Sequence, residues 1–467
     1  MPLIESFSGI RGVYDDGMDE QVAIRYAYSY LSFIKKKYGD KIKIVIGTDT
    51  RPSREILKNA LMEAFDCEII DLGIASTPMT EFAVRHYKAD GGIVITASHN
   101  EPYWNGFKFL DKDGSVLKAS DMGKIIKTYS KIKNLSGKDF FNKHLYKNIN
   151  PNNIKIKKVI KKYDEINKKY SGYVLGFLSN EEKEKIRNSK LKVIIDPNGG
   201  AGIIAKQILE RLGVRVMGIN MKHGIFNRAV EPNEDSLIYL TNYLRNENYD
   251  FAAGFDCDAD RVEIMTGKQL VSGNHLLALI ADDILKNSKN KAVVVNNATS
   301  LMVRDIAKKH NARYVETETG ETNVVNEMYR LKAAVGGEGS SGGVIIPDSR
   351  CRDGILTLLF LIKIIASKGK KIEELVEKLP QYYNIKTKMT IDSKKSSSII
   401  RKIHAHYSRN YKTKKSKEGS LKVMLNKNSF VWFRASKTEA DLLRVIADSP
   451  NRERTEMIIK EALKLIK

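Results

Sequence analysis

The stretch Lys41-Ile42-Lys43-Ile44-Val45-Ile46, followed by Gly47-Thr48-Asp49-Thr50-Arg51, begins the pattern that decides the fold. Its apolar run predicts a buried strand, and the polar run that follows predicts a loop. A helical pattern then covers about 53–65, and a second apolar strand is predicted at 68–72. A strand, a helix and a strand within roughly 30 residues have the size of one βαβ unit.

The same order returns twice along the chain. The second copy has apolar runs at 191–195 and 214–216, and the third has them at 292–295 and 312–315. Three copies predict three similar α/β domains, each with a buried mixed sheet covered by helices. Because several α/β architectures contain such repeats, the repeats alone predict a fold class and no activity.

The composition is that of an ordinary soluble protein, with 42% hydrophobic and 29% charged residues. A chain of 467 residues is too long for one hydrophobic core and predicts three or four domains. Three widely spaced cysteines favour a reducing compartment over a disulfide framework. The start has no signal-peptide pattern, and the apolar run 355–366 is too short to cross a bilayer. We therefore expect a cytoplasmic protein with no membrane attachment.

The charge is strongly positive, at +23, because 79 Lys and Arg residues face 56 Asp and Glu residues. Such a balance permits nucleic-acid binding, and it suits a small anionic substrate equally well. The lysines are densest between residues 124 and 169, where they alternate with Ile, Tyr and Asn. That alternation favours solvated helix faces over a nucleic-acid site.

The stretch 96–108, Thr-Ala-Ser-His-Asn-Glu-Pro-Tyr-Trp-Asn-Gly-Phe-Lys, directly follows a predicted strand at 92–95. A serine followed by His, Asn, Pro and Gly is expected on a tight loop at the end of that strand. Taken alone, the pair Ser98-His99 is more often an ordinary polar turn than a catalytic pair.

A second loop, at 254–261, carries Asp256, Asp258 and Asp260 at alternate positions. Three carboxylates can converge on one loop only if they share a cation, because their repulsion otherwise raises their pKa values. Hard oxygen ligands favour Mg²⁺. The alternative is an acidic surface turn, whereas an EF-hand is excluded because its downstream Gly and Glu spacing is absent.

Two further loops suit a sugar phosphate. The glycine-rich stretch 336–343 offers Glu338 and two serines, which match the donors and acceptors of sugar hydroxyls. A phosphate cradle is the rival interpretation, but it lacks the lysine of a P-loop. The stretch 434–439 offers Arg434 and two hydroxyls for an anion, although a helix N-cap explains these residues equally well.

Together with Ser8-Gly9-Ile10-Arg11-Gly12, these motifs stand in the order of the α-D-phosphohexomutases, which the chain resembles over essentially its whole length. The resemblance implies three similar α/β mixed-sheet domains and a smaller C-terminal α+β domain around a central cleft. We expect the domains at 1–150 with the phosphoserine loop, 151–253, 254–371 with the metal and sugar loops, and 372–467 with the phosphate-binding loop.

The resemblance also implies a reaction and its residues. A hexose 1-phosphate and a hexose 6-phosphate interconvert through a phosphoserine at Ser98 and a hexose 1,6-bisphosphate that serves as intermediate and activator. Mg²⁺ would be bound by Ser98, Asp256, Asp258 and Asp260. The implied catalytic residues are Ser98, Lys108, Arg11 and His99, with Lys108 a better general acid/base than His99. The implied substrate-binding residues are Arg261, Thr319, Gly320, Glu338, Ser340, Arg434, Ser436 and Thr438.

In the serine stretch the family's Pro is displaced by one, to Glu101-Pro102, and four further positions depart from the family pattern. Cys257 and Lys437 stand where the family has Gly, Ala440 replaces Pro, and Gly342 replaces the His of several bacterial members. Cys257 would be strained if its position required a positive φ.

We expect a mannose- or glucose-type mutase, with phosphoglucosamine mutase as the alternative. A sugar-phosphate-binding non-enzyme and a nucleic-acid-binding protein are the alternatives from other classes. The expected partner is a hexose phosphate, with no nucleic acid and no membrane, in a monomer or homodimer.

Overall fold

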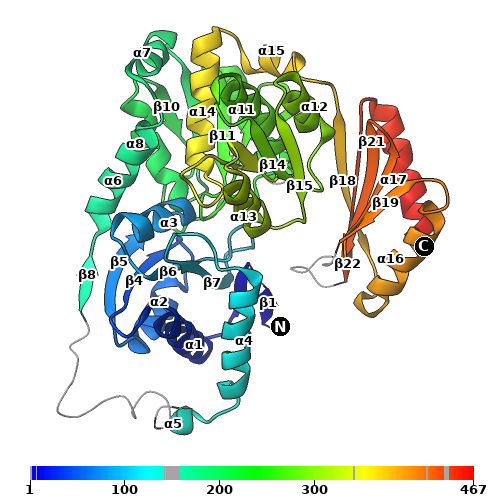
Figure 1. The fold of residues 1–467 in the computed structure, drawn as a ribbon. Coiled ribbons are helices and arrows are strands. Elements are labelled where there is room, and N and C mark those ends of the chain that lie inside the picture. Colours follow the sequence, from blue (N-terminus) through cyan, green and yellow to red (C-terminus); the bar gives the residue numbers. More distant parts are fainter. Residues whose placement is uncertain are drawn as a thin grey trace. The chain divides into compact units, whose positions relative to one another are not determined.

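The computed structural model describes residues 3–6, 8–140, 142, 158–339, 342–416, 419–435 and 441–466. The chain forms two compact units, which are described separately. The first unit joins Met1–Leu270 to Pro347–Gly369, and the second joins Val271–Ile346 to Lys370–Lys467. Figure 1 labels the elements of both units. No helix in the described ranges is both long and apolar enough to span a membrane.

The first sheet has the strand order β1-β2-β7-β6-β4-β5-β8, with β3 paired to β2. Its strands are β1 (Ile4–Ser6), β2 (Gly9–Tyr14), β3 (Gly17–Met18), β4 (Lys43–Thr48), β5 (Glu68–Ile74), β6 (Gly91–Ile95), β7 (Trp104–Asp111) and β8 (Val159–Lys161). Its helices are α1 (Glu20–Tyr38), α2 (Arg54–Glu63), α3 (Thr77–His86), α4 (Ala119–Ile132) and α5 (Gly137–Phe140).

Side-chain alternation assigns the two faces of this sheet. Ile44 and Ile46 of β4 and Phe107 and Phe109 of β7 enter one core with residues of α1, α2 and α4. The other face is covered by α3, which packs on β4 and β6. Figure 1 shows α1 and α2 on one side of the sheet and α3 on the other. The side chains of Lys108 and Arg11, which are described below, lie on the α3 face of this sheet.

The second sheet has the order β10-β9-β11-β12-β13. Its strands are β9 (Lys192–Asp196), β10 (Arg215–Gly218), β11 (Phe251–Phe255), β12 (Val262–Met265) and β13 (Leu270–Val271). Its helices are α6 (Tyr163–Leu175), α7 (Asn180–Ser189), α8 (Ile204–Glu210), α9 (Glu234–Leu237) and α10 (Leu240–Glu247). The later helix α14 (Gly354–Lys368) packs on α7 and β12 within the same unit.

The expected boundary between residues 253 and 254 falls inside this second sheet. β11 and β12 are antiparallel neighbours with Phe255 opposite Val262, and residues 256–261 connect them. The acidic loop, as we call residues 256–261, therefore belongs to the second sheet. The expected boundary at 150 lies outside the described residues.

The second unit holds the two remaining sheets. The third has the order β15-β14-β16-β17, and the fourth, which is antiparallel, has the order β18-β22-β21-β20-β19. The third is built from α11 (Gly273–Asn287), β14 (Ala292–Asn296), α12 (Leu301–Lys309), β15 (Arg313–Thr317), α13 (Glu321–Leu331), β16 (Val335–Gly337) and β17 (Val344–Ile345). The helix α15 (Ile372–Glu377) then leads to the fourth sheet.

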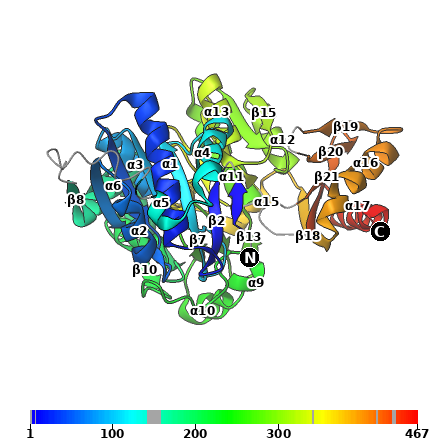
Figure 2. The ribbon, with the colours of Figure 1, turned by 90° about the horizontal axis from the view of Figure 1, so that it is seen from below.

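The fourth sheet carries both of its helices on one face. Its elements are β18 (Tyr383–Thr390), α16 (Ser396–Tyr407), β19 (Lys412–Lys415), β20 (Leu421–Asn426), β21 (Ser429–Ala435), β22 (Leu442–Ser449) and α17 (Arg452–Ile466). Ile403 of α16 and Ile458 of α17 share a core with Val431 and Phe433 of β21. Figure 2 shows α16 and α17 beside this sheet. The predicted C-terminal α+β domain is thereby confirmed.

The three predicted βαβ units are also confirmed, as β4-α2-β5, β9-α8-β10 and β14-α12-β15. In each unit the two strands are parallel. A third parallel strand, β6, β11 or β16, then pairs with the other side of the first strand. The order in which strands are added to the sheet therefore reverses next to the first strand of each unit. In α/β proteins, the loops that follow the carboxyl ends of the strands at such a reversal form the ligand site. Ser98, Asp256 and Glu338 all follow that third strand.

Candidate active site

Ser98 lies in a strained turn just after β6. Its φ is +54°, in the left-handed region that side chains other than glycine rarely adopt. The backbone N–H of Ser98 donates to Thr96 Oγ1 at 2.8 Å, and the residue is only 1% exposed. Its hydroxyl donates to Asp256 Oδ2 at 3.1 Å. The candidate nucleophile thus contacts the acidic loop directly.

Neighbouring strands supply two cations to the same face. Phe107 and Phe109 point into the core, so the alternation of β7 places Lys108 on the opposite face. Ile10 is likewise in the core, which places its neighbour Arg11 of β2 on the Lys108 side. A buried apolar core on one face therefore positions two polar groups on the other.

Both cations are tied to the site. Lys108 Nζ donates to Asp258 Oδ2 at 2.7 Å and to Asp260 Oδ2 at 2.9 Å. Arg11 Nη1 donates to the side-chain oxygen of Asn100, two residues beyond Ser98, at 2.9 Å. Burial and the neighbouring Arg261 lower the pKa of Arg11 to about 10. His99 is partly buried and lies next to Ser98 in the same turn.

The acidic loop is held in shape by backbone bonds from three other segments. Cys257 O accepts from Ala201 N at 2.8 Å, and Asp258 O accepts from Thr77 N at 3.0 Å. Ala259 O accepts from Gly354 N at 3.1 Å. A Cβ atom at Gly354 would lie 2.9 Å from that carbonyl oxygen, so this approach requires glycine.

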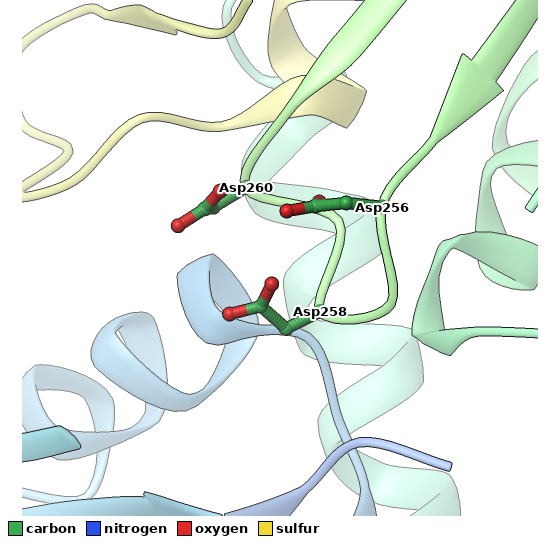
Figure 3. A group of neighbouring side chains, drawn as sticks. All are labelled: Asp256, Asp258 and Asp260. Atoms are coloured by element: carbon green, nitrogen blue, oxygen red, sulfur yellow. The ribbon is translucent and has the colours of Figure 1, made fainter. Parts of the chain in front are cut away.

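The three aspartates form a set that fits a divalent cation. Each offers a carboxylate oxygen within 4.8 Å of the others, and all three side chains are buried. Figure 3 shows the three carboxylates pointing to the same side of the loop. Asp258 Oδ1 and Asp260 Oδ1 have no hydrogen-bond partner among the described residues. Buried carboxylate oxygens without donors are suited to a hard metal ion such as Mg²⁺.

The electrostatics of the triad agree with this assignment. Burial raises the pKa of Asp256 well above its ordinary value, and the charges of Asp260 and Asp258 raise it further. Burial would also raise the pKa of Asp260, but Arg352, Lys108 and Arg261 outweigh it and hold that pKa below its ordinary value. Nearby positive charge therefore favours the ionised form of Asp260, whereas the ionised form of Asp256 needs further positive charge, such as a bound cation.

Two residues of this site have no motif in the sequence. Thr77, the first residue of α3, donates its hydroxyl to Asp258 Oδ2 at 2.6 Å. Arg352 Nη2 donates to Asp260 Oδ2 at 3.2 Å. Both come from segments distant in sequence, so only the fold brings them to the acidic loop. Arg261, which the sequence predicts as a substrate-binding residue, has its Nε atom 3.8 Å from Asp256 Oδ2 and 3.7 Å from Asp260 Oδ1.

Cys257 is not strained. The left-handed residue of the acidic loop is Ala259, with φ +54°, whereas Cys257 is not among the positive-φ residues. The buried thiol of Cys257 lies 3.6 Å from Thr50 Oγ1, and burial raises its pKa well above the ordinary value. A neutral thiol facing a hydroxyl is a packing group and not a metal ligand.

In the second unit, the predicted sugar-loop residues lie close together. Glu338 Oε1 accepts hydrogen bonds from Gly320 N and from Asn296 Nδ2, both at 2.8 Å. Thr319 Oγ1 donates to Asn297 Oδ1 at 3.1 Å. Ser340 lies outside the described residues.

The predicted phosphate loop is described only at its start. Arg434 lies near the end of β21, opposite Arg444 in the register of the neighbouring strand β22. Ser436 and Thr438 lie outside the described residues.

Comparisons with known proteins place the chain in a family. Models described as phosphoglucomutase/phosphomannomutase, alpha/beta/alpha domains I, II and III match residues 5–136, 171–269 and 272–383. A phosphoglucomutase/phosphomannomutase of Thermococcus kodakarensis is 30% identical over 466 residues, which covers 98% of this chain and 97% of the relative. A phosphoglucosamine/phosphogalactosamine mutase of Sulfurisphaera tokodaii is 26% identical over 470 residues, which covers 98% of this chain and 98% of the relative.

A solved structure shows the same fold. It is a phosphoglucomutase/phosphomannomutase family protein of Burkholderia thailandensis, which superposes with a TM-score of 0.81 at 21% identity and covers 99% of this chain and 97% of its own. The three domain matches and the relative at 30% identity confirm the resemblance seen in the motifs. The chain belongs to the phosphoglucomutase/phosphomannomutase family of phosphohexomutases, which are isomerases that act by intramolecular phosphoryl transfer.

Proposed function

We propose that the protein interconverts a hexose 1-phosphate and the corresponding hexose 6-phosphate through a phosphoserine at Ser98. The observation that carries the proposal is the bond between Ser98 Oγ and Asp256 Oδ2, which joins the serine to a buried aspartate triad. Lys108 and Arg352 also face this triad. Such a group of charges can stabilise a phosphoryl group carried by the serine and the transfer of that group.

The proposed step moves one phosphoryl group between two oxygens. The bond between phosphorus and Ser98 Oγ breaks as a sugar hydroxyl oxygen bonds to phosphorus. The proton of that hydroxyl leaves to a base, and a proton later returns to Ser98 Oγ. Lys108 Nζ, which donates to Asp258 and Asp260 here, would be that base once these carboxylates bind the metal instead. The product is a hexose 1,6-bisphosphate, which turns around in the site and returns its other phosphoryl group to Ser98.

Asp256, Asp258 and Asp260 would hold Mg²⁺ together with the Ser98 phosphate, where the ion would neutralise charge on the transferred phosphoryl group. Arg11 and Arg261 would stabilise the remaining phosphate charge. The donor set and its burial support this proposal.

The sugar and phosphate loops that the sequence predicts would bind the rest of the substrate. Glu338, with Ser340 and the Thr319-Gly320 loop, would bind sugar hydroxyls. Arg434, with Ser436 and Thr438, would bind the phosphate that does not react. If that loop binds either phosphate, a reoriented bisphosphate presents each end to Ser98 in turn.

The proposal is tested by mass and turnover. The purified protein incubated with glucose 1,6-bisphosphate and Mg²⁺ should gain the mass of one phosphate, and Ser98→Ala should gain none and lose mutase activity. Ser130→Ala, on the exposed side of α4 in the same domain, is the matched control and should behave like wild type. Full turnover by Ser98→Ala would overturn the proposed mechanism.

We infer that mannose and glucose phosphates are the preferred substrates, as the name of the Thermococcus kodakarensis relative suggests. The name of the Sulfurisphaera tokodaii relative supports phosphoglucosamine as the second candidate. Initial rates with the 1-phosphates of glucose, mannose and glucosamine decide between them. A kcat/KM for glucosamine 1-phosphate at least ten times higher than for the other two would reverse the assignment.

A further inference from the structure

Arg51 is a fully buried arginine that does not belong to the acidic loop or to the proposed substrate contacts. It follows β4, in the first loop of the first βαβ unit, and its exposed fraction is 0%. Asp49, two residues earlier, accepts from Arg51 Nε at 3.0 Å and from its backbone N–H at 3.0 Å. The guanidinium is therefore fixed in one orientation by its own loop.

The remaining four guanidinium donors all reach one segment, the serine loop, as we call residues 96–104. Arg51 Nη2 donates to two carbonyl oxygens and Nη1 to two more. The acceptors are Ser98 O at 2.7 Å, Asn100 O at 2.6 Å, Glu101 O at 2.5 Å and Trp104 O at 2.9 Å. All five N–H donors of the arginine are thus used, four of them on the main chain around the proposed phosphoserine.

This arrangement accounts for a conformation that the serine loop would not adopt alone. Ser98 has a φ of +54°, which is unfavourable for a residue with a Cβ atom and persists only where the surroundings enforce it. Four bonds from one rigid fork to a short segment enforce its path. The same first loop also touches the acidic loop, because Thr50 Oγ1 lies 3.6 Å from Cys257 Sγ.

We propose that Arg51 is a positioning residue for phosphoryl transfer, which holds the serine loop so that Ser98 Oγ meets the aspartate triad. The proposal rests on the proposed function, because it assumes that Ser98 carries the phosphoryl group. Arg51 acts through the loop and touches neither the substrate nor the reacting atoms. A lysine cannot replace it, since three donors on a flexible stem cannot satisfy four carbonyl acceptors.

The test compares Arg51→Lys with Arg25→Lys. Arg25 is a matched control because it is also buried in the first domain and donates to the main-chain carbonyls of Ile132 and Leu135, far along the chain from the serine loop. Two quantities are measured at a temperature where both variants are folded: the rate at which glucose 1,6-bisphosphate phosphorylates Ser98, followed by intact mass, and the steady-state kcat and KM.

We expect Arg51→Lys to slow phosphorylation and lower kcat by about 100-fold, because a misplacement of about 1 Å at the reacting atoms costs that much. KM should change little, and Arg25→Lys should retain nearly full kcat. If Arg51→Lys does not fold, Asp49→Asn takes its place in the experiment, because it keeps the guanidinium and weakens its support. For Asp49→Asn we expect a smaller loss of kcat without a change in KM.

Equal kcat values for a folded Arg51 or Asp49 variant and for Arg25→Lys would overturn the proposal. A wild-type protein that neither gains a phosphate nor turns over sugar phosphates would instead contradict the proposed function itself. The two failures are therefore distinguishable in one set of measurements.

Discussion

The hydroxyl group of Thr77, together with Lys108 Nζ, orients one of the candidate metal ligands. Thr77 Oγ1 donates to Asp258 Oδ2 at 2.6 Å, while Asp258 Oδ1 has no hydrogen-bond partner among the described residues. One oxygen of this carboxylate is thus engaged and the other is available. Groups that orient a metal ligand in this way commonly change metal affinity when they are removed.

We predict that Thr77→Val raises the Mg²⁺ concentration needed for half-maximal activity by about 10-fold or more, because the methyl group keeps the volume and removes the donor. The measurement is a Mg²⁺ titration of mutase activity. Thr80→Val is the control, since Thr80 is buried in the same helix and donates to Ser76 O at 2.9 Å. Identical Mg²⁺ requirements in the two variants would contradict the prediction.

Asp353 is a second residue whose surroundings have a measurable consequence. It caps α14 by accepting from Leu356 N at 2.9 Å, and it accepts from Tyr170 OH at 2.6 Å. Burial raises its pKa from 3.8 to about 6. The pKa of Asp353 is higher in the folded state than in the unfolded state, so its ionised form destabilises the fold. The full effect is present above pH 6, and it is absent at pH values far below 4.

We predict that Asp353→Asn stabilises the protein at pH 8, by on the order of 2 kcal/mol, because asparagine keeps the capping acceptor without the charge. The gain should shrink as the pH falls toward 4. Thermal midpoints of both proteins across this range test it. A stability difference that does not vary with pH would show that the charge of Asp353 is not its cause.

At the scale of one element, the acidic loop tolerates a cysteine where the family has glycine. The strained position is Ala259, and the Cys257 side chain fills a buried space beside Thr50. The substitution therefore adds buried volume and removes the conformational freedom of a glycine, and both effects stabilise a fold.

We predict that Cys257→Gly lowers the free energy of unfolding by about 1–2 kcal/mol and leaves kcat within about 2-fold of wild type. Thermal midpoint and kcat are measured on the same preparation. A large increase in kcat would mean instead that the cysteine hinders the acidic loop in its catalytic role.

The sequence allowed the repeated units and the acidic loop to be predicted because their signals are local. The helix predicted at 53–65 is α2 at Arg54–Glu63, and the strand predicted at 68–72 is β5. The sequence gives no signal for the contacts of Arg51, because its acceptors are main-chain carbonyls about 50 residues further along the chain. Main-chain acceptors leave no residue type to recognise, so only the folded structure could identify this contact.

At the scale of the molecule, the three α/β sheets use the same device. In the first, Arg51 after β4 holds the serine loop after β6. In the second, Asp196 at the end of β9 accepts from Arg228 Nε, and Arg228 Nη2 donates to Phe255 O at 2.8 Å, just before Asp256. In the third, Asn296 at the end of β14 donates to Glu338 after β16.

The repeat therefore explains how three similar sheets support the three loops for which different roles are proposed. Each first strand ends in a residue that fixes the functional loop after the adjacent third strand, either directly or through an arginine. What differs is the chemistry of the loop that is held: a serine, three aspartates, or a glutamate. The architecture predicts that damage to one such support affects the function of its own loop.

We predict that Arg228→Lys raises the Mg²⁺ concentration needed for half-maximal activity by about 10-fold, because the support of the acidic loop is lost. At saturating Mg²⁺, Ser98 of this variant should be phosphorylated at nearly the wild-type rate. Arg51→Lys should show the opposite pattern, with a slow phosphorylation that added Mg²⁺ does not restore. Arg245→Lys is the control for the second sheet, since Arg245 is exposed on α10 and donates to the main-chain carbonyl of Gly267, away from the acidic loop. If both variants lose metal affinity and phosphorylation rate to the same extent, the two supports act on one shared structure and not each on its own loop.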